Sequence, residues 1–350
     1  ILEAIEELGF EKPTPIQAES IPHLLHSTQD LIAFAQTGTG KTAAFGLPSV
    51  HLTDVKQKEP QTLILCPTRE LCNQIAKDLK SFSKYIRGFN VAAVYGGASI
   101  ETQIKDLKKG AHIVVGTPGR TNDLIRRKKL KLSSIERLVL DEADEMLNMG
   151  FKEELDSILE SVAEDRQTLL FSATMPKGIV AITKKYMNDP LEISVAAKNT
   201  GTKNVTHHYY MVQAKDRYEV IKRIADSNPS IYGIIFCRTR REAKDVAARL
   251  MGDGYNADAL HGDLSQALRD DAMDRFRKGQ IQLLVATDVA ARGLDVNNLT
   301  HVINYIFQMT PKYTHTVQEE QDALVITEPQ LLSFMDAKKE KLERLKNYRK

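Results

Sequence analysis

The sequence predicts an α/β protein made of two parallel-sheet domains joined by a short linker. Over residues 1–195, short β-rich runs alternate with amphipathic helical patterns, which is typical of βαβ units and a parallel sheet. Residues 196–205 are polar, with Lys, Asn, Thr and Gly and little apolar content, which predicts a linker. The alternation restarts over residues 206–327, so we expect a second domain of similar build.

Each predicted strand is a short run rich in apolar residues. In the first domain we expect strands at residues 30–36, 62–67, 91–95, 112–116, 137–141, 168–172 and 191–195. In the second domain we expect them at residues 207–213, 231–237, 257–260, 281–286, 300–305 and 323–327. A charged helix is expected over residues 328–350, where the basic face is either simply solvated or in contact with RNA.

The composition limits the class of protein. With 350 residues, 42% of them hydrophobic, the chain is long enough for two or three domains with real cores. Its 48 basic and 46 acidic residues give a net charge of only +2, so any phosphate contacts must be local. Three cysteines without metal-ligand spacing fit a reducing compartment. We found no membrane-length apolar run and no signal peptide, and therefore expect a cytoplasmic monomer without a membrane partner.

Residues 35–42 read Ala-Gln-Thr-Gly-Thr-Gly-Lys-Thr, which has the spacing of a phosphate-binding loop between a strand and a helix. Glycines let successive N–H groups and the helix N-terminus point at the anion. The expected ATP-binding residues are Gly38, Thr39, Gly40, Lys41 and Thr42. Lys41 would supply a charge to the β- and γ-phosphates, and the Thr42 hydroxyl would ligate Mg²⁺. The strict pattern has Gly where this chain has Ala35.

An acidic tetrad, Asp141-Glu142-Ala143-Asp144, follows the apolar strand at 137–141. Open α/β sheets bind ligands at the carboxyl ends of their strands, so the tetrad is expected beside the phosphate loop. Asp141 is placed to hold the metal, directly or through water, and Glu142 to orient and deprotonate the attacking water. Lys41, Asp141 and Glu142 are therefore the candidate catalytic residues.

Together these residues resemble the DEAD-box RNA helicases, and the resemblance covers about residues 9–315. It is carried by the tetrad and by segments similar to other motifs of that family, at residues 9–17, 67–74, 96–97, 117–120, 172–174 and 286–295. The resemblance implies two RecA-like domains that bind ATP and RNA between them. It also implies that Gly293 and Asp295 complete the nucleotide site from the second domain.

The segment around Gln17 has two interpretations. Proline-rich segments such as Pro13-Thr14-Pro15 often merely cap a helix, whereas a carboxamide can also match the N6 and N7 edge of adenine. The resemblance implies the second role, with Phe10 stacked on the base, and predicts ATP over GTP. Similarly, Ser172 and Thr174 are suited to cap a helix, and the resemblance implies a compatible second role, a link to Asp144 that couples hydrolysis to unwinding.

Hydroxyls, backbone amides and arginines follow several predicted strands, and such groups bind phosphates without reading bases. An arginine in this position is alternatively only a surface charge. The resemblance assigns RNA contacts to Pro67, Thr68, Arg69, Gly97, Thr117, Arg120, Arg238, Thr239, Gly262, Gln266, Arg269 and Thr287. We therefore expect sequence-independent binding to the RNA backbone.

The pattern breaks near the end of the second domain. The family's last motif should begin at His315 and supply arginine fingers to the γ-phosphate, yet no arginine occurs between Arg292 and Arg344. Such fingers contribute about 10³- to 10⁵-fold to rate in related enzymes. Either a segment is missing from the sequence, or the protein lacks the motif, or the chain has been deliberately altered.

The sequence thus predicts an RNA-stimulated ATPase that uses ATP and Mg²⁺ and locally unwinds short RNA duplexes. The alternative, motivated by the missing arginines, is an ATP-dependent RNA clamp with little hydrolysis. A DNA helicase is a weaker third interpretation. Since backbone contacts carry little sequence information, accessory proteins are the expected source of targeting.

Overall fold

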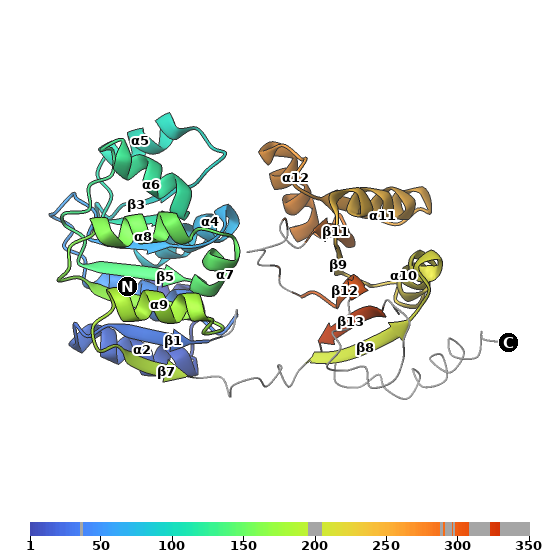
Figure 1. Ribbon diagram of the computed structural model, residues 1–350, viewed down its shortest axis with the longest axis horizontal. Helices are drawn as coiled ribbons and strands as arrows, with labels where there is room; N and C mark the ends of the chain where they lie inside the picture. The colour runs from blue at the N-terminus through green and yellow to red at the C-terminus, as the bar shows by residue number, and fades with distance from the viewer. Residues whose placement is uncertain are drawn as a thin grey trace. The chain divides into compact units, whose positions relative to one another are not determined.

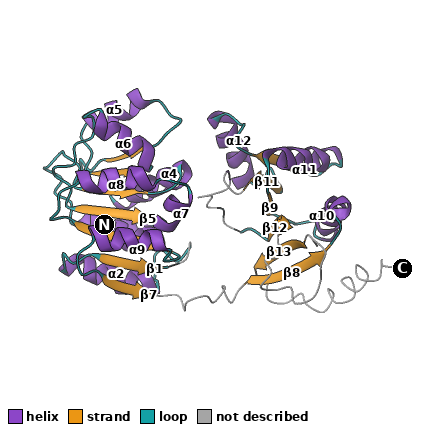
Figure 2. Cartoon of the chain, in the orientation of Figure 1, coloured by secondary structure: helices purple, strands orange, loops and turns teal. Residues whose placement is uncertain are grey.

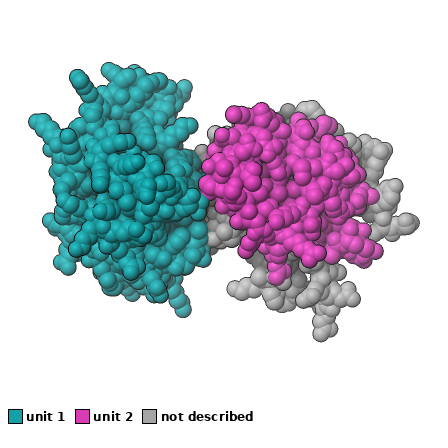
Figure 3. Space-filling model, turned by 90° about the horizontal axis from the view of Figure 1, so that it is seen from above, with its two compact units in different colours: residues 1–200 teal, residues 201–350 magenta. Residues whose placement is uncertain are grey.

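The computed structural model describes residues 1–35, 38–194, 205–287, 290, 296, 298–307 and 323–329. The chain divides into two compact units, Ile1–Thr200 and Gly201–Lys350 (Figure 3). Most of the predicted linker lies outside the described residues, except that Val205 is the first residue of strand β8 (Val205–Met211). The predicted helix at 328–350 also lies outside them, apart from Glu328 and Pro329, which belong to a strand.

Unit 1 is built on a seven-stranded sheet with the order β3-β4-β2-β5-β6-β1-β7 (Figure 1). Every neighbouring pair in it is parallel, which confirms the predicted fold class for this unit. All the strands expected from the sequence occur: β1 (Leu31–Phe34), β2 (Thr62–Leu65), β3 (Val91–Val94), β4 (Ile113–Gly116), β5 (Arg137–Asp141), β6 (Gln167–Ser172) and β7 (Leu191–Ser194).

Helices cover both faces of this sheet (Figure 2), because the central strands are apolar on both sides and must be covered on both. One face packs against α2 (Pro15–His26), α3 (Lys41–His51) and α4 (Arg69–Phe82). The other face packs against α5 (Ile100–Lys108), α6 (Pro118–Arg126), α7 (Ala143–Asn148), α8 (Lys152–Ser161) and α9 (Lys177–Tyr186). The short α1 (Leu2–Glu7) contacts α4, and Glu7 pairs there with Lys84.

Unit 2 has a six-stranded sheet with the order β10-β11-β9-β12-β13-β8. Its strands are β8, β9 (Gly233–Cys237), β10 (Ala257–Leu260), β11 (Leu283–Thr287), β12 (His301–Phe307) and β13 (Ala323–Pro329), and its described helices are η1 (Ala214–Asp216), α10 (Arg217–Ser227), α11 (Arg240–Gly252) and α12 (Gln266–Arg277). The strands from β10 to β12 are parallel, as predicted. However, β13 is antiparallel to both β12 and β8, so this sheet is mixed at one edge. The apolar pattern of a strand does not encode its direction, which explains the difference.

Within the described residues, no helix combines the length and the apolar character needed to cross a bilayer. The three cysteines are free and buried: Cys66 and Cys72 in unit 1, and Cys237 in unit 2. Burial raises the pKa of the Cys66 thiol. Because the thiolate is the reactive form, this thiol is unreactive in the folded protein.

Candidate nucleotide and nucleic-acid site

The carboxyl edge of the unit 1 sheet divides into two halves. The neighbouring strands β5, β6 and β1 end at the acidic tetrad, at Ser172 and at the phosphate loop. The neighbouring strands β3, β4 and β2 end just before Gly97, Thr117 and Thr68. The fold therefore places the phosphate loop, the tetrad and Ser172 on one half of this edge, and Gly97, Thr117 and Thr68 on the other.

The phosphate loop requires glycine for two reasons. Gly38 and Gly40 have φ angles of 79° and 88°, in the left-handed region that favours glycine. A Cβ atom on Gly40 would also lie only 2.4 Å from Nε2 of Gln17. The remaining loop residues Gln36 and Thr37 lie outside the described residues.

Lys41 begins helix α3 and is buried, with 7% of its surface exposed. Its ammonium Nζ donates a hydrogen bond to the carbonyl oxygen of Ala35 at 3.2 Å, across the loop. Thr42 follows in the first turn of the helix and is half-buried. A cation held across a loop at a helix N-terminus favours a bound anion.

Gln17 connects this loop to helix α2. Its Oε1 accepts a hydrogen bond from the Thr14 backbone N–H at 3.0 Å, and its Nε2 donates to the Gly40 carbonyl at 3.1 Å. Sequence reasoning set helix capping against nucleotide binding, whereas the structure shows the cap and a direct contact with the phosphate loop. Phe10 lies 6.3 Å from Phe82 between ring centroids and is 42% exposed.

The acidic tetrad combines burial with close charges. Burial raises the pKa of Asp141, which is 2% exposed, while the positive charge of Lys41 opposes that shift. Burial and then the neighbouring Asp141 charge raise the pKa of Glu142 to about 7. Glu142 also adopts φ 51° and ψ 51°, a left-handed conformation that is strained for a non-glycine residue. A strained carboxylate that titrates near neutral pH is suited to act as a general base.

The structure brings Ser172, Thr174 and Asp144 together. The backbone N–H and the hydroxyl of Thr174 both donate to Oδ2 of Asp144, at 3.0 and 2.7 Å. The Ser172 hydroxyl donates to the Thr174 carbonyl oxygen at 2.7 Å. Helix α9 has its N-cap at Pro176, so neither hydroxyl caps it, and the capping interpretation is wrong.

On the other half of the edge, two arginines pack against the loop at residues 96–98. A Cβ atom on Gly97, which has φ 79°, would lie 2.0 Å from Nη1 of Arg69. The guanidinium of Arg120 donates to the Ala98 carbonyl oxygen at 3.2 and 3.1 Å. These arginines are therefore packed against the backbone of the loop and are not merely surface charges.

Thr68 and Thr117 occupy the N-cap positions of α4 and α6 and are each 7% exposed, and Pro67 directly precedes Thr68. Sequence reasoning missed Gln103, which accepts from Arg120 at 2.9 Å and donates to the Tyr95 carbonyl at 3.0 Å. Its signal in the sequence is a glutamine on the buried face of an otherwise amphipathic helix.

In unit 2, the predicted RNA residues follow the adjacent strands β10, β11 and β9, or begin a nearby helix. Thr239 caps α11 by accepting from the Glu242 N–H, and the Arg238 N–H donates to the Glu242 carboxylate. Arg269 donates to the Ala290 carbonyl oxygen at 3.1 Å. The others are placed as follows: Gln266 donates to Asp270, Gly262 follows β10, and Thr287 ends β11. The predicted nucleotide residues Gly293 and Asp295 lie outside the described residues.

The donor set of unit 1 fits Mg²⁺. Within the described part of the chain, no three His, Cys, Asp or Glu side chains cluster so as to hold a metal ion by themselves. Mg²⁺ bound with a nucleotide needs only one or two carboxylates, because phosphates and water complete its shell. Asp141 offers a buried carboxylate with one oxygen, Oδ1, accepting from the Glu142 N–H at 3.1 Å, and Thr42 offers a hydroxyl.

Comparison with known proteins identifies the family to which this chain is similar. The DEAD/DEAH box helicase family matches residues 14–182, and the helicase conserved C-terminal domain matches residues 216–322. A solved DEAD box protein from the hyperthermophile Methanococcus jannaschii is 43% identical, with a TM-score of 0.54, and the match covers 89% of this chain and 84% of that one. This chain belongs to the DEAD-box helicase family.

Other DEAD-box proteins extend the comparison. The ATP-dependent RNA helicase DeaD of Escherichia coli is 46% identical over 318 residues, which are 91% of this chain and 50% of the relative. This DEAD-box chain therefore spans about half the length of that curated relative. The solved structure of Saccharomyces cerevisiae Dbp5 bound to RNA and ADP BeF3 is 29% identical, with a TM-score of 0.77 over 89% of this chain and 79% of that one.

Proposed function

We propose that this DEAD-box protein is an ATP-dependent RNA helicase that binds single-stranded RNA through its backbone and locally unwinds short duplexes. The observation that carries the proposal is the pairing, on one sheet edge, of a phosphate loop with Lys41 buried and a tetrad with Glu142 titrating at about 7. The relatives named as RNA helicases support the same activity. We infer that the substrate is RNA bound without regard to its sequence and that accessory proteins bring this RNA to the enzyme. We also infer that the protein acts as a monomer in the cytoplasm.

The nucleotide-binding and catalytic residues of unit 1 each have a distinct role in this proposal. Lys41 holds the β- and γ-phosphates, and Gln17 ties the loop to the segment that faces the base. Mg²⁺, held by Asp141 and Thr42, would neutralise phosphate charge when bound. Glu142 takes the proton of the attacking water, which requires its carboxylate to be ionised.

The contact between Thr174 and Asp144 gives the proposal its coupling element. A change in the tetrad on hydrolysis would be transmitted to Thr174 through its two hydrogen bonds to a single oxygen of Asp144. Arg69 and Arg120, which pack against residues 96–98, lie on the same edge, so a movement of this edge would alter the affinity for RNA. In unit 2, Arg238, Gln266 and Thr287 supply further backbone contacts.

The test is RNA-stimulated phosphate release by the wild type and by Lys41→Ala and Glu142→Gln. We expect both variants to lose stimulated turnover while retaining their folded circular-dichroism spectrum. Wild-type turnover in either variant would refute the assigned site. A duplex with a short single-stranded extension, incubated with ATP, then measures strand separation.

The absence of arginine between Arg292 and Arg344 favours one second candidate, an RNA clamp that scarcely hydrolyses ATP. ATP-dependent retention of RNA without phosphate release, even at high enzyme concentration, would support the clamp. Brisk RNA-stimulated turnover would eliminate it. The intact mass of the purified chain shows whether a segment is missing, since residues 1–350 alone have a mass of 39.3 kDa.

A further inference from the structure

The amino edge of the unit 1 sheet, opposite the candidate site, carries a concentration of basic side chains. Three loops enter the neighbouring strands β4, β2 and β5 from this edge. The loop before β2 carries Lys56 and Lys58, and the end of α5 before β4 carries Lys108 and Lys109. The end of α6 and the loop that follows it, before β5, carry residues 126–131, which read Arg-Arg-Lys-Lys-Leu-Lys. All these basic side chains are exposed, and we call them the amino-edge basic surface.

The three loops touch one another, although they are far apart in the sequence. A Cβ atom on Gly110 would lie 3.3 Å from Cβ of Lys58, which joins the first two loops. The Ser134 hydroxyl donates to Glu59 at 2.7 Å, which joins the first and third. The amino-edge basic surface is thus one continuous feature of the fold.

Acidic residues neutralise only part of this surface. The ion pairs at this edge are Lys109 with Asp106, Arg127 with Asp123, Lys131 with Glu59 and Arg137 with Glu136. Within the described residues, ion pairs leave the following cations unmatched: Lys56, Lys58, Lys108, Arg126, Lys128 and Lys129. A surplus of one sign on a local surface attracts an extended partner of the other sign, even though the whole chain has a net charge of only +2.

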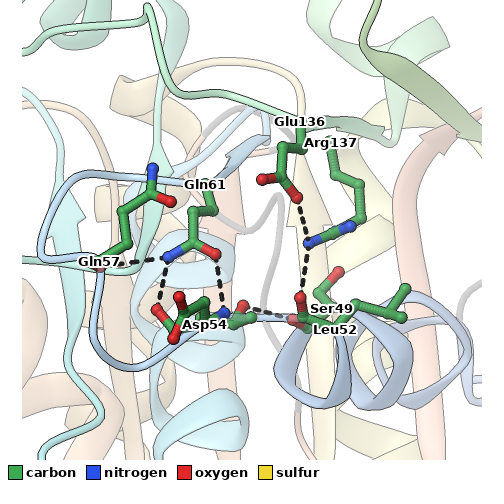
Figure 4. Close-up of polar contacts among 8 residues, drawn as sticks. Ser49, Leu52, Asp54, Gln57, Gln61, Glu136 and Arg137 are labelled. Carbon is green, nitrogen blue, oxygen red and sulfur yellow. Dashed lines mark hydrogen bonds and ion pairs between the residues drawn. The ribbon is translucent and has the colours of Figure 1, made fainter.

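The loop that presents Lys56 and Lys58 is held in place by side chains (Figure 4). Gln61 accepts from the Asp54 N–H and donates to the Asp54 and Gln57 carbonyl oxygens, at 2.8, 2.8 and 3.2 Å. Beside it, the buried Arg137 donates to the Leu52 carbonyl oxygen at the end of α3, at 3.3 Å. Since the backbone is already ordered, a ligand bound here does not have to order it.

Lys128 has a backbone conformation that is unusual for a lysine. It ends the turn after α6 with φ 57°, a left-handed conformation in which glycine or asparagine is the usual residue. The turn therefore places a lysine where the backbone alone would favour a residue without a long side chain.

We propose that the amino-edge basic surface is a second RNA site, which binds the phosphate backbone of RNA flanking the strand held at the carboxyl edge. The inference rests on the proposed helicase function, because RNA is then already bound to the same unit. The exposed, spread lysines suit a row of phosphates better than one compact anion. Strand β5 has five residues, so the two edges are at least about 15 Å apart, and only RNA longer than the bound strand reaches both.

The test compares two triple variants with the same change of charge. Lys58→Glu, Lys108→Glu and Lys129→Glu take one residue from each loop. The control, Lys184→Glu, Lys215→Glu and Lys278→Glu, changes exposed lysines that do not belong to the three loops. Binding is measured without nucleotide to an RNA duplex of about 20 base pairs with a single-stranded extension, over a range of salt concentrations. Thermal melting verifies that both variants are folded.

We expect the first variant to bind this RNA about tenfold or more weakly than the wild type, and the control to bind like the wild type. Each lost phosphate contact lowers the slope of log K against log salt by about 0.9 on a duplex, so the slope should fall by roughly 2 to 3. Both variants should keep the ATP turnover stimulated by a strand of about six nucleotides, which is short enough to be bound wholly at the carboxyl edge.

Equal binding by the first variant and the wild type would overturn the proposal, as would equal losses in both triple variants. Loss of binding to phosphatidylserine vesicles with unchanged RNA binding would assign the surface to membranes and overturn it too. As an independent readout, RNA should protect Lys58, Lys108 and Lys129 from acetylation in the wild type, but not Lys215 or Lys278. A wild type without turnover on the short strand would refute the helicase proposal alone, because the binding comparison uses no nucleotide.

Discussion

The two units differ in how their candidate residues are held. In unit 1, Gln17, Lys41 and Asp141 are buried. Gln17 and Lys41 donate hydrogen bonds to backbone carbonyls of the phosphate loop, and Asp141 interacts with the charge of Lys41. In unit 2, Arg238 and Gly262 are exposed at the ends of strands. The packing of unit 1 thus positions these three side chains, whereas Arg238 and Gly262 of unit 2 are surface groups, although Thr287 there is buried. Changes at Lys41 and at the acidic tetrad of unit 1 should therefore abolish chemistry, whereas a change at an exposed residue such as Arg238 of unit 2 should only weaken RNA binding.

The largest effect should come from Lys41→Ala. The variant loses the cation that hydrogen-bonds across the phosphate loop, so we expect RNA-stimulated kcat/KM for ATP to fall by about 10³-fold or more. Lys80→Ala, an exposed lysine in the last turn of α4, is the matched control and should turn over normally. A loss of tenfold or less would show that unit 1 does not depend on this cation.

Glu142→Gln should lower turnover by about 10²- to 10⁴-fold, because the amide cannot accept the proton of water. The wild type should show the matching pH dependence. Since the pKa of Glu142 is about 7, turnover should rise about tenfold per pH unit below that value and level off above it. A flat profile between about pH 5.5 and 8 would argue against Glu142 as the base.

Although Glu142→Gln lowers turnover, it should raise the stability of the folded protein above neutral pH. The pKa of Glu142 is raised on folding from 4.5 to about 7, so its contribution to stability is fully present below 4.5 and lost as the pH rises through 7. Glu142→Gln removes that loss, on the order of 2 to 3 kcal/mol above pH 7. Tm of the variant should exceed that of the wild type at about pH 8 and equal it near pH 4.5. Equal Tm values at both pH values would contradict a raised pKa of Glu142 in the folded protein.

Gly97→Ala should have a smaller effect, confined to RNA. The new methyl group strains a residue at φ 79° and displaces the Arg69 guanidinium, so RNA affinity should fall by about tenfold. Gly96→Ala is the control, because nothing lies within 4 Å of its Cβ position. Similar affinities for the two variants would exclude the contact between Arg69 and Gly97 as an RNA determinant.

The smallest effect should come from unit 2. Arg238→Ala removes one exposed charge, and we expect RNA affinity to fall about threefold and the salt slope by about 0.7 on a single strand. Arg241→Ala, whose side chain is 93% exposed on the same helix end, should leave both unchanged. A loss of catalysis in Arg238→Ala comparable to that of Lys41→Ala would break the contrast between the units.

The sequence predicted every strand of both sheets, because buried parallel strands are continuous apolar runs such as Leu138-Val139-Leu140. It did not predict the direction of β13, which alternation does not encode. In the site, residue types at strand ends located the phosphate loop and the tetrad. The contacts of Gln17 with Gly40 and of Gln103 with Arg120 were not predictable, since they depend on how separate elements pack.

The rate at which the buried cysteines react with a thiol reagent reports how often each unit opens locally. A thiol reagent reacts with Cys66 or Cys72 only when unit 1 opens locally, and with Cys237 only when unit 2 opens. Because the three thiols lie on different peptides, mass spectrometry of alkylated protein reads the two opening rates separately in one sample. Added ATP should slow the labelling of unit 1 first, as its binding energy raises the free energy of opening of the unit that holds it.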